Sequence, residues 1–275
     1  MRSNTGKVII AAAGPGDPGL ITVKAAIALQ EADVILTDRL ASREVISAYA
    51  KPNARVIEVG KQGGKLNSTP QKTINECLVE FALQGKKIVR LKGGDVSVYS
   101  NILDELLTLH QHGIAFEIIP GVTAALGAAA YAGIPLTARG YSTGLRILTY
   151  YHSEVITNKE WKDIAQTTDT LVFYMSAQSL NDLSSNLLRF GMDPEMPIAV
   201  IEQATTTAQN VFVIDLKSAV EIPVDNIQTP ALIIIGRVAS LYPRFKWFEP
   251  SQSAATAFSE VPHQTIPPTV QRTVI

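Results

Sequence analysis

The sequence predicts an α/β fold made of two α/β domains that follow one another along the chain. In both halves, short apolar runs of strand length alternate with longer stretches that have the spacing of amphipathic helices. Several of these runs end in glycine or aspartate, where a strand would turn. The length of 275 residues allows one large or two ordinary domains. We expect an N-terminal domain over residues 1–137, a C-terminal domain over 138–245 and a disordered tail over 246–275.

Five buried strands are expected in the first half, because β-branched and apolar residues gather there without polar interruption. They cover Val8–Ala13, Val34–Thr37, Arg55–Val59, Lys87–Leu91 and Phe116–Ile119. Helices are expected between and after them, over Leu20–Glu31, Ser42–Ala50, Pro70–Gln84, Asn101–Gln111 and Ala124–Ala132. The many alanines of the last helix predict close packing against another backbone, and Gly133 is expected at its C-terminal cap.

The second half has the same rhythm. Strands are expected over Leu145–Tyr150, Thr170–Met175, Pro197–Ile201, Asn210–Ile214 and Ala231–Ile235. Helices are expected over Asn158–Ala165 and Gln178–Phe190. The final residues are rich in Ser, Thr, Gln and Pro without apolar periodicity, which is why we expect a disordered tail.

Composition limits the function classes. The net charge is −1, and no basic excess points to a nucleic-acid partner. The single cysteine, Cys77, excludes an internal disulfide framework, indicates a reducing compartment and is expected as a small buried residue. No apolar run approaches the roughly 20 residues that cross a bilayer. The polar start leads directly into a strand, without the apolar core of a signal peptide. We therefore expect a cytosolic protein with no membrane partner.

The stretch from Lys87 to Asp95 has the clearest chemistry. An apolar strand runs directly into Gly93-Gly94-Asp95. Ligands of open α/β sheets bind outside the carboxyl ends of the strands, and glycines there let a ligand approach the backbone. The stretch therefore indicates a ligand site, although an ordinary turn has the same residues.

The first strand is followed by Gly14-Pro15-Gly16-Asp17-Pro18-Gly19, which matches G-x-G-x-x-G, and Asp38 closes the second strand. This pattern is typical of dinucleotide binding and keeps a dinucleotide-dependent oxidoreductase open as an alternative. Two features argue against it. Pro15 and Pro18 have no N–H to offer a pyrophosphate, and Asp17 adds a negative charge. The loop suits a neutral or cationic ligand, such as a sulfonium.

A series of motifs resembles, in order, those of the tetrapyrrole methylase family, over roughly residues 8–240. The matching segments are Ala13–Ala25, Ala32–Leu40, Val59–Lys61, Val89–Asp95, Pro120–Ala125, Tyr131–Thr137, Tyr174–Met175 and Thr229–Leu232. Asp38-Arg39-Leu40, Val59-Gly60-Lys61 and the run Arg90–Asp95 are typical of the branch of uroporphyrinogen-III C-methyltransferases.

The resemblance implies two α/β domains with an active-site cleft between them, a homodimer, and S-adenosylmethionine as methyl donor, with S-adenosylhomocysteine as product. It also implies two methylations of uroporphyrinogen III, through precorrin-1 to precorrin-2, in sirohaem or cobalamin biosynthesis. We expect the reaction to stop there, because the chain shows no dehydrogenase or chelatase extension. A methyltransferase acting on a later corrin intermediate and a non-catalytic binding module remain alternatives.

The resemblance assigns Asp38 as proton acceptor and Lys61 as proton donor, and no metal is expected. From the residues alone, the alternatives are that Asp38 caps or pairs with Arg39 and that Lys61 is a solvated lysine. The donor-binding residues implied by the resemblance are Pro15, Gly93, Gly94, Asp95, Val98, Thr123, Ala124, Met175, Ala204 and Ala231. Among these, Thr123 has helix capping as its alternative and Met175 has core packing.

The acceptor is rich in carboxylates, so basic side chains in loops are candidates for binding it. Besides Lys61, these are Arg39, Lys65, Lys92 and Arg139. The chain departs from the family pattern at four places on the presumed acceptor side. These are Val96–Asn101, where flexible glycines and an arginine are missing, Ala138–Gly140, Tyr151–His152 and Lys65–Ser68.

Overall fold

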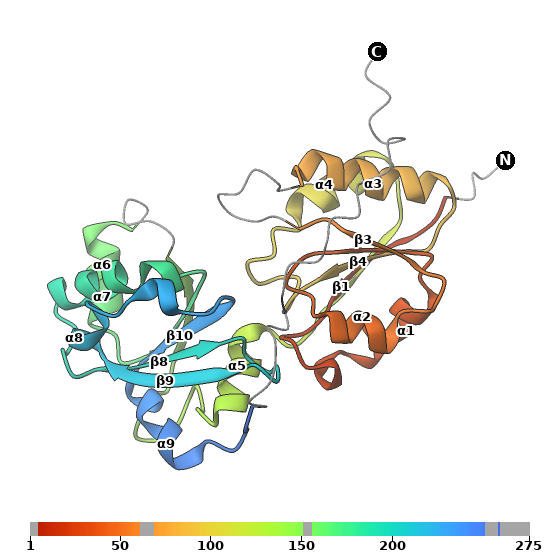
Figure 1. The fold of residues 1–275 in the computed structure, drawn as a ribbon. Helices are drawn as coiled ribbons and strands as arrows, with labels where there is room; N and C mark the ends of the chain where they lie inside the picture. Colours follow the sequence, from red (N-terminus) through yellow and green to blue (C-terminus); the bar gives the residue numbers. More distant parts are fainter. Residues whose placement is uncertain (1–4, 61–68, 151–155, 251–257, 259–275) are drawn as a thin grey trace. The chain divides into compact units, whose positions relative to one another are not determined.

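The computed structural model of the chain describes residues 5–60, 69–150, 156–250 and 258 (Figure 1). The chain forms two compact units that divide between Thr123 and Ala124, whereas we expected the boundary between residues 137 and 138. The division lies earlier because helix α5 (Ala124–Ala132) packs on the sheet of the second unit, in one apolar cluster with Ala199 and Ile234. That the units are independent domains stays a prediction.

The first unit is built on a parallel sheet with the strand order β3-β2-β4-β1-β5. Its strands are β1 (Val8–Ala12), β2 (Val34–Thr37), β3 (Arg55–Glu58), β4 (Ile88–Lys92) and β5 (Phe116–Ile119). The five strands predicted for this half are confirmed, with ends that differ by at most one residue. Because these strands are parallel, their carboxyl ends lie along one edge of the sheet.

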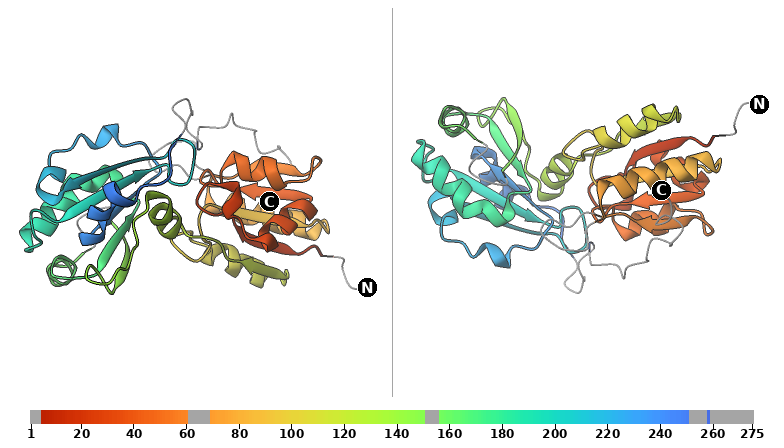
Figure 2. Two further views of the ribbon diagram at one scale, coloured as in Figure 1. Left: turned by 90° about the horizontal axis from the view of Figure 1, so that it is seen from below. Right: turned by 90° about the horizontal axis from the view of Figure 1, so that it is seen from above.

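Helices cover both faces of this sheet (Figures 1 and 2). They are α1 (Val23–Glu31) and α2 (Arg43–Tyr49) on one face, and α3 (Gln71–Leu83) and α4 (Leu103–Gln111) on the other. Leu29 of α1 packs with Ile35, and Leu78 of α3 packs with Ile10. Cys77 belongs to the α3 cluster, and its burial raises the pKa of the thiol. The expectation of a small buried cysteine is confirmed.

A buried ion cluster lies between β4 and α4. Glu105 is fully buried, and its Oε1 lies 3.0 Å from Arg90 Nε and 3.4 Å from Lys92 Nζ. Arg90 Nη1 also donates to the carbonyl oxygens of Leu36 and Leu91, at 3.3 Å and 3.2 Å. Burial and the nearby Arg90 lower the pKa of Lys92. One carboxylate therefore offsets two cations in the core.

The second unit has a mixed sheet with the order β6-β7-β10-β8-β9. Its strands are β6 (Leu145–Thr149), β7 (Thr170–Tyr174), β8 (Pro197–Glu202), β9 (Asn210–Asp215) and β10 (Ala231–Ile235). β6 and β7 are parallel, and β10 and β9 run antiparallel to their neighbours. The five predicted strands are confirmed here too.

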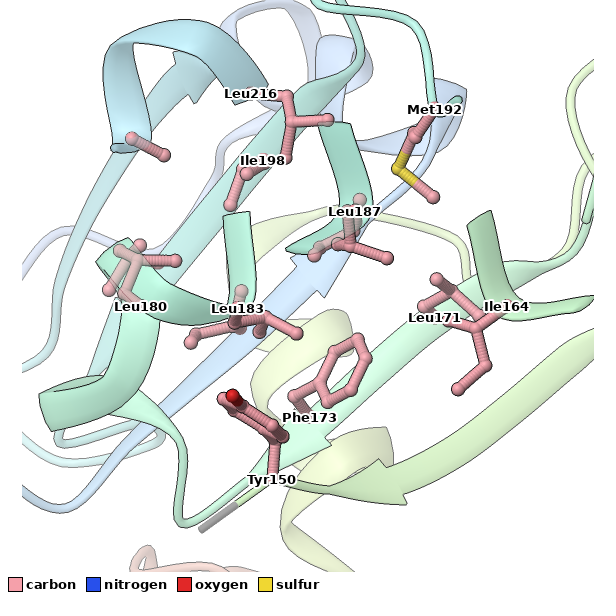
Figure 3. Close-up of a cluster of buried hydrophobic side chains, with 14 of the residues drawn as sticks. Tyr150, Ile164, Leu171, Phe173, Leu180, Leu183, Leu187, Met192, Ile198 and Leu216 are labelled. Atoms are coloured by element: carbon pink, nitrogen blue, oxygen red, sulfur yellow. The ribbon is translucent and has the colours of Figure 1, made fainter. Parts of the chain in front are cut away.

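Different helices pack on the two faces of this second sheet. One face packs against α6 (Asn158–Ala165), α7 (Leu180–Arg189) and α8 (Leu216–Ala219). Figure 3 shows that core, in which Leu183 and Leu187 of α7 meet Phe173 of β7. The other face packs against the small residues of α5, as predicted from its alanines, and against Tyr242 of α9 (Tyr242–Phe245).

The chain after α9 returns to α5. Gly133 ends α5 with a φ of 67°, and a Cβ there would lie 2.1 Å from Phe245 O. Trp247 Nε1 donates to Ala130 O at 2.8 Å, and the Tyr131 and Trp247 rings lie 5.3 Å apart. The expected disordered tail, 246–275, is therefore wrong for its first residues, which pack on the helix. Residues 251–257 and 259–275 lie outside the described part.

The Glu105 cluster gives a stability prediction. Glu105→Leu should lower the free energy of unfolding by about 3–5 kcal/mol, because Arg90 and Lys92 would be left as buried charges without their counterion. Urea denaturation followed by circular dichroism measures this. The control is Glu76→Leu, which removes an exposed partner 3.9 Å from Lys72 and should cost at most about 1 kcal/mol. Equal shifts in both variants would contradict the prediction.

Candidate functional site

The candidate site of the first unit lies at the carboxyl edge of its sheet, where β1 and β4 end in glycine turns. Gly94 N donates to Gly14 O at 2.8 Å, and Gly14 N donates to Gly94 O at 3.2 Å. Both glycines have left-handed backbones, with φ of 78° at Gly14 and 65° at Gly94, which cost most other residues about 1–2 kcal/mol. The Gly93-Gly94-Asp95 turn is therefore at the strand end, where we expected it.

Gly93 serves the packing of the chain itself. A Cβ on Gly93 would lie 2.5 Å from both Leu40 Cβ and Leu40 O. We expected Gly93 to leave space for a ligand, but the space is filled by Leu40. The expected close approach of a ligand to the backbone therefore rests on Gly94.

Asp38 joins the end of β2 to the end of β4. Its Oδ1 accepts hydrogen bonds from Leu40 N and Ala41 N, each at 3.0 Å. Gly93 N donates to both carboxylate oxygens, at 3.2 Å to Oδ1 and 3.3 Å to Oδ2. Capping, which was the alternative to proton transfer, is thus present in the structure. The catalytic role stays a prediction, and Oδ2 is the less engaged oxygen.

Asp95 ties the end of β4 to the turn that follows β5. Its Oδ1 accepts from Ser97 N at 2.8 Å and from the Ser97 hydroxyl, and its Oδ2 accepts from Gly121 N at 2.8 Å. Burial opposes ionisation, but these hydrogen bonds outweigh it and hold the pKa of Asp95 below its usual value. Asp95 is therefore a structured anion at this edge.

The loop after β1 is held by side chains of the chain itself. The Asp17 carboxylate accepts from Gly19 N at 2.6 Å. From the N-cap of α2, Ser42 Oγ donates to Gly16 O at 2.7 Å. Pro15 lies within this loop and is buried. A carboxylate thus occupies a backbone N–H that an anionic ligand would otherwise use.

The loop does not open directly into a helix. It leads to a single 3-10 turn, Pro18–Leu20, and α1 begins at Val23 with Thr22 as its N-cap. We expected the helix to start at Leu20. A pyrophosphate would need the N-terminus of a helix at the glycines, so the structure disfavours dinucleotide binding here.

The segment after Asp95 differs from the family pattern in its sequence, and its backbone is strained. Tyr99 and Asn101 have positive φ values of 52° and 50°. Asparagine tolerates this region, whereas tyrosine does so at a cost of about 1–2 kcal/mol. Val98, a predicted donor-binding residue, directly precedes Tyr99 and is half-buried. Tyr99 and Asn101 therefore adopt left-handed conformations although neither residue is a glycine.

The predicted substrate-binding residues differ in their burial and in the elements that carry them. Arg39 is half-buried, and its Nε has no hydrogen-bond partner among the described residues. Arg139 is exposed in a turn of the second unit. We expected Lys92 in a loop, but it is the last residue of β4 and is buried against Glu105. Lys61 and Lys65 lie outside the described residues.

In the second unit, three predicted donor-binding residues come to one end of the sheet. β10 lies between β7 and β8 and runs antiparallel to both, so its start, Ala231, lies beside the ends of those strands. Ala231 pairs with Glu202, the last residue of β8. Met175 follows β7, and Ala204 follows β8 by two residues. The sheet topology thus gathers Met175, Ala204 and Ala231.

This end of the second sheet also carries backbone strain. Met175, Gln203 and Thr205 have φ values of 55°, 44° and 65°. Such conformations in residues with side chains cluster at functional sites. Met175 is also 56 % exposed, so core packing, its alternative role, does not apply.

The remaining two predicted donor-binding residues are adjacent in the chain. Thr123 is buried and is the last residue of the first unit, and Ala124 is the first residue of α5. At the next position, Ala125 N donates to the hydroxyl of Tyr174 at 2.7 Å.

Sequence reasoning missed Glu105 and Gln203. Glu105 had a usable signal, since it is a carboxylate in the first turn of an amphipathic helix that follows a strand with two basic residues. Gln203 had none, because its position at the junction of three strands depends on tertiary pairing.

No group of three His, Cys, Asp or Glu side chains that could hold a metal ion occurs among the described residues. None of the described helices is both long and apolar enough to cross a membrane.

Comparison with curated proteins gives relatives that are about twice as long as this chain. Siroheme synthase from Thioalkalivibrio sulfidiphilus is 40 % identical over 250 residues, which are 90 % of this chain and 51 % of the relative. Siroheme synthase 2 from Yersinia enterocolitica is 38 % identical over 258 residues, which are 94 % of this chain and 54 % of the relative. The chain thus spans about half the length of these relatives.

Two solved structures are similar over most of the chain. One is uroporphyrin-III C-methyl transferase from Thermus thermophilus complexed with S-adenyl homocysteine. It is 34 % identical with a TM-score of 0.72, covering 86 % of this chain and 100 % of that one. The other is cobalt precorrin-4 methyltransferase, a cobalamin biosynthetic enzyme. It is 27 % identical with a TM-score of 0.75, covering 85 % and 95 %.

The family model described as Tetrapyrrole (Corrin/Porphyrin) Methylases matches residues 7–220. That range contains the glycine turns of β1 and β4, the Asp38 bridge and the strained end of the second sheet. The chain therefore belongs to the tetrapyrrole methylases, a family of methyltransferases.

Proposed function

We propose that the chain transfers methyl groups from S-adenosylmethionine to uroporphyrinogen III, in two successive steps through precorrin-1 to precorrin-2. The observation that carries this proposal is the 34 % identity to a uroporphyrin-III C-methyl transferase whose whole length the chain matches. The 38–40 % identity to siroheme synthases supports a place in sirohaem biosynthesis. Precorrin-2 would then serve sirohaem or cobalamin biosynthesis. A homodimer and a cytosolic location stay predictions.

The residues of the first unit fit a cationic donor. Asp17, Asp38 and Asp95 place three carboxylates around the ends of β1, β2 and β4. Pro15 and Pro18 withhold two N–H groups, and Asp17 uses a third. A negative, donor-poor edge attracts a sulfonium and repels a phosphate. We propose that Gly94 and Asp95 contribute to donor binding here, and that Met175, Ala204 and Ala231 do so in the second unit.

S-adenosylmethionine supplies an electrophilic methyl group on a sulfonium. A pyrrole carbon of the acceptor attacks that methyl carbon, and the electron pair of the broken bond stays on sulfur. The chain's own part is to hold both reactants in line and to take a proton from the methylated macrocycle. Asp38 Oδ2 is the proposed proton acceptor, because Gly93 N is its one hydrogen-bond partner among the described residues. Arg39, with an unsatisfied Nε, is the proposed partner of an acceptor carboxylate.

A second candidate acceptor is a later corrin intermediate. The observation that favours it is the TM-score of 0.75 with cobalt precorrin-4 methyltransferase. The unusual segment from Val96 to Asn101 supports it as well, because it departs from the uroporphyrinogen-III pattern beside Asp95.

Direct assay separates these functions. Purified protein incubated with S-adenosylmethionine and enzymatically made uroporphyrinogen III should give products with one and then two added methyl groups, detected by mass spectrometry. In calorimetric titration, S-adenosylhomocysteine should bind and NAD(H) should not. Methylation of a later corrin intermediate alone would favour the second candidate. Donor binding without product from either acceptor would indicate a non-catalytic binding module.

Asp38→Asn tests the proton acceptor. Asparagine keeps an oxygen for the Leu40 and Ala41 N–H groups but cannot take the proton, so kcat should fall about 10²-fold or more while the thermal midpoint changes little. The matched control is Asp33→Asn at the opposite end of β2, where the carboxylate accepts from Lys87 N at 2.9 Å. That variant should keep the wild-type kcat. Equal kcat values for Asp38→Asn and the wild type would show that Asp38 only caps the backbone and takes no proton.

A further inference from the structure

Gln203, directly after β8, has a buried amide oxygen without a partner. The residue is 2 % exposed, and its Oε1 accepts no hydrogen bond from any described residue. An unmade hydrogen bond at a buried polar atom costs about 1–3 kcal/mol. Such an atom in a folded protein calls for an explanation, and a bound ligand as its hydrogen-bond donor is one.

The backbone of Gln203 needs no such partner. Its N–H donates to Pro230 O at 2.8 Å, and its carbonyl accepts from Thr206 N at 3.2 Å and Thr206 Oγ1 at 2.7 Å. These bonds hold the residue in a left-handed conformation, with φ of 44°. These bonds thus fix the backbone, whereas the side-chain oxygen has no partner among the residues that the structure describes.

An exposed methionine lies at the same end of the sheet as Gln203. Met175 directly follows β7, is 56 % exposed and has a φ of 55°. One strand, β10, lies between β7 and β8, so the two residues are about two strand spacings, or about 10 Å, apart. An exposed thioether packs well on an aromatic ring, and a purine is wide enough to reach from it toward Gln203.

We propose that Gln203 recognises the adenine base of the methyl donor, with Oε1 accepting a hydrogen bond from the exocyclic amino group. This inference rests on the proposed function, in which the donor is S-adenosylmethionine. A glutamine amide presents an acceptor and a donor in one plane, and an edge of adenine presents the complementary pair. Met175 packs on the ring, and Gln203 distinguishes adenine from bases without the amino group.

The test compares two ligands by isothermal titration calorimetry. One is S-adenosylhomocysteine, and the other is its analogue with an unsubstituted purine, which lacks the amino group. The wild-type protein should bind the analogue about tenfold more weakly, the value of one net hydrogen bond. Gln203→Met, which has a similar shape without polar atoms, should bind both ligands with the same, weaker affinity.

A second measurement separates recognition from packing. The thermal midpoint of unliganded Gln203→Met should rise, because the variant removes a buried acceptor that has no partner. The control Gln166→Met changes an exposed glutamine at the end of α6 and should keep the discrimination between ligands. A lower midpoint together with equal losses for both ligands would show a packing role and overturn the inference.

The behaviour of the wild-type protein separates failure of the inference from failure of the proposed function. If it binds both ligands equally, or if Gln203→Met keeps the discrimination, the inference is wrong and the proposed function stands. If the wild-type protein binds no S-adenosylhomocysteine, the proposed function fails, and the inference fails with it.

Discussion

The hydrogen bonds accepted by Asp38 are the interaction on which the geometry of the first candidate edge depends. One carboxylate binds the N–H groups of Leu40 and Ala41 after β2 and of Gly93 after β4. Gly93 can be held this closely only because it lacks a Cβ, which would meet Leu40. The next residue, Gly94, pairs with Gly14 after β1. Three strand ends are thereby fixed to one another.

Both units combine satisfied hydrogen bonds with strained or unpartnered groups at their candidate sites. In the first, the oxygens of Asp95 bind Ser97 and Gly121, while Arg39 Nε has no partner among the described residues. The second holds Met175 and Gln203 in left-handed conformations, and Gln203 Oε1 has no partner among the described residues. Satisfied groups position the backbone, whereas strained and unsatisfied groups are what a ligand can relieve. This combination is consistent with a methyltransferase whose catalysis consists mainly of positioning its reactants.

Prediction from the sequence succeeded for the strands and failed at their junctions. The apolar runs of β1 and β4 indicate buried strands whatever their neighbours are. The shift of β4 by one residue places Lys92 inside the strand, where it pairs with Glu105 instead of facing a loop. The helix expected from Leu20 starts at Val23, because Asp17 caps a 3-10 turn first. The expected tail begins with Trp247 docked on α5, a long-range contact that composition cannot reveal.

The sequence by itself determined the α/β class, the order of the strands along the chain and the family motifs, because local apolar patterns and glycine turns carry that information. Tertiary structure decided which predicted residues meet. Met175, Ala204 and Ala231 gather because β10 runs antiparallel between β7 and β8. Asp38 and Gly93 meet because β2 and β4 are neighbours although α2, β3 and α3 separate them in the chain. Such pairings depend on contacts between distant segments, and no local pattern encodes them.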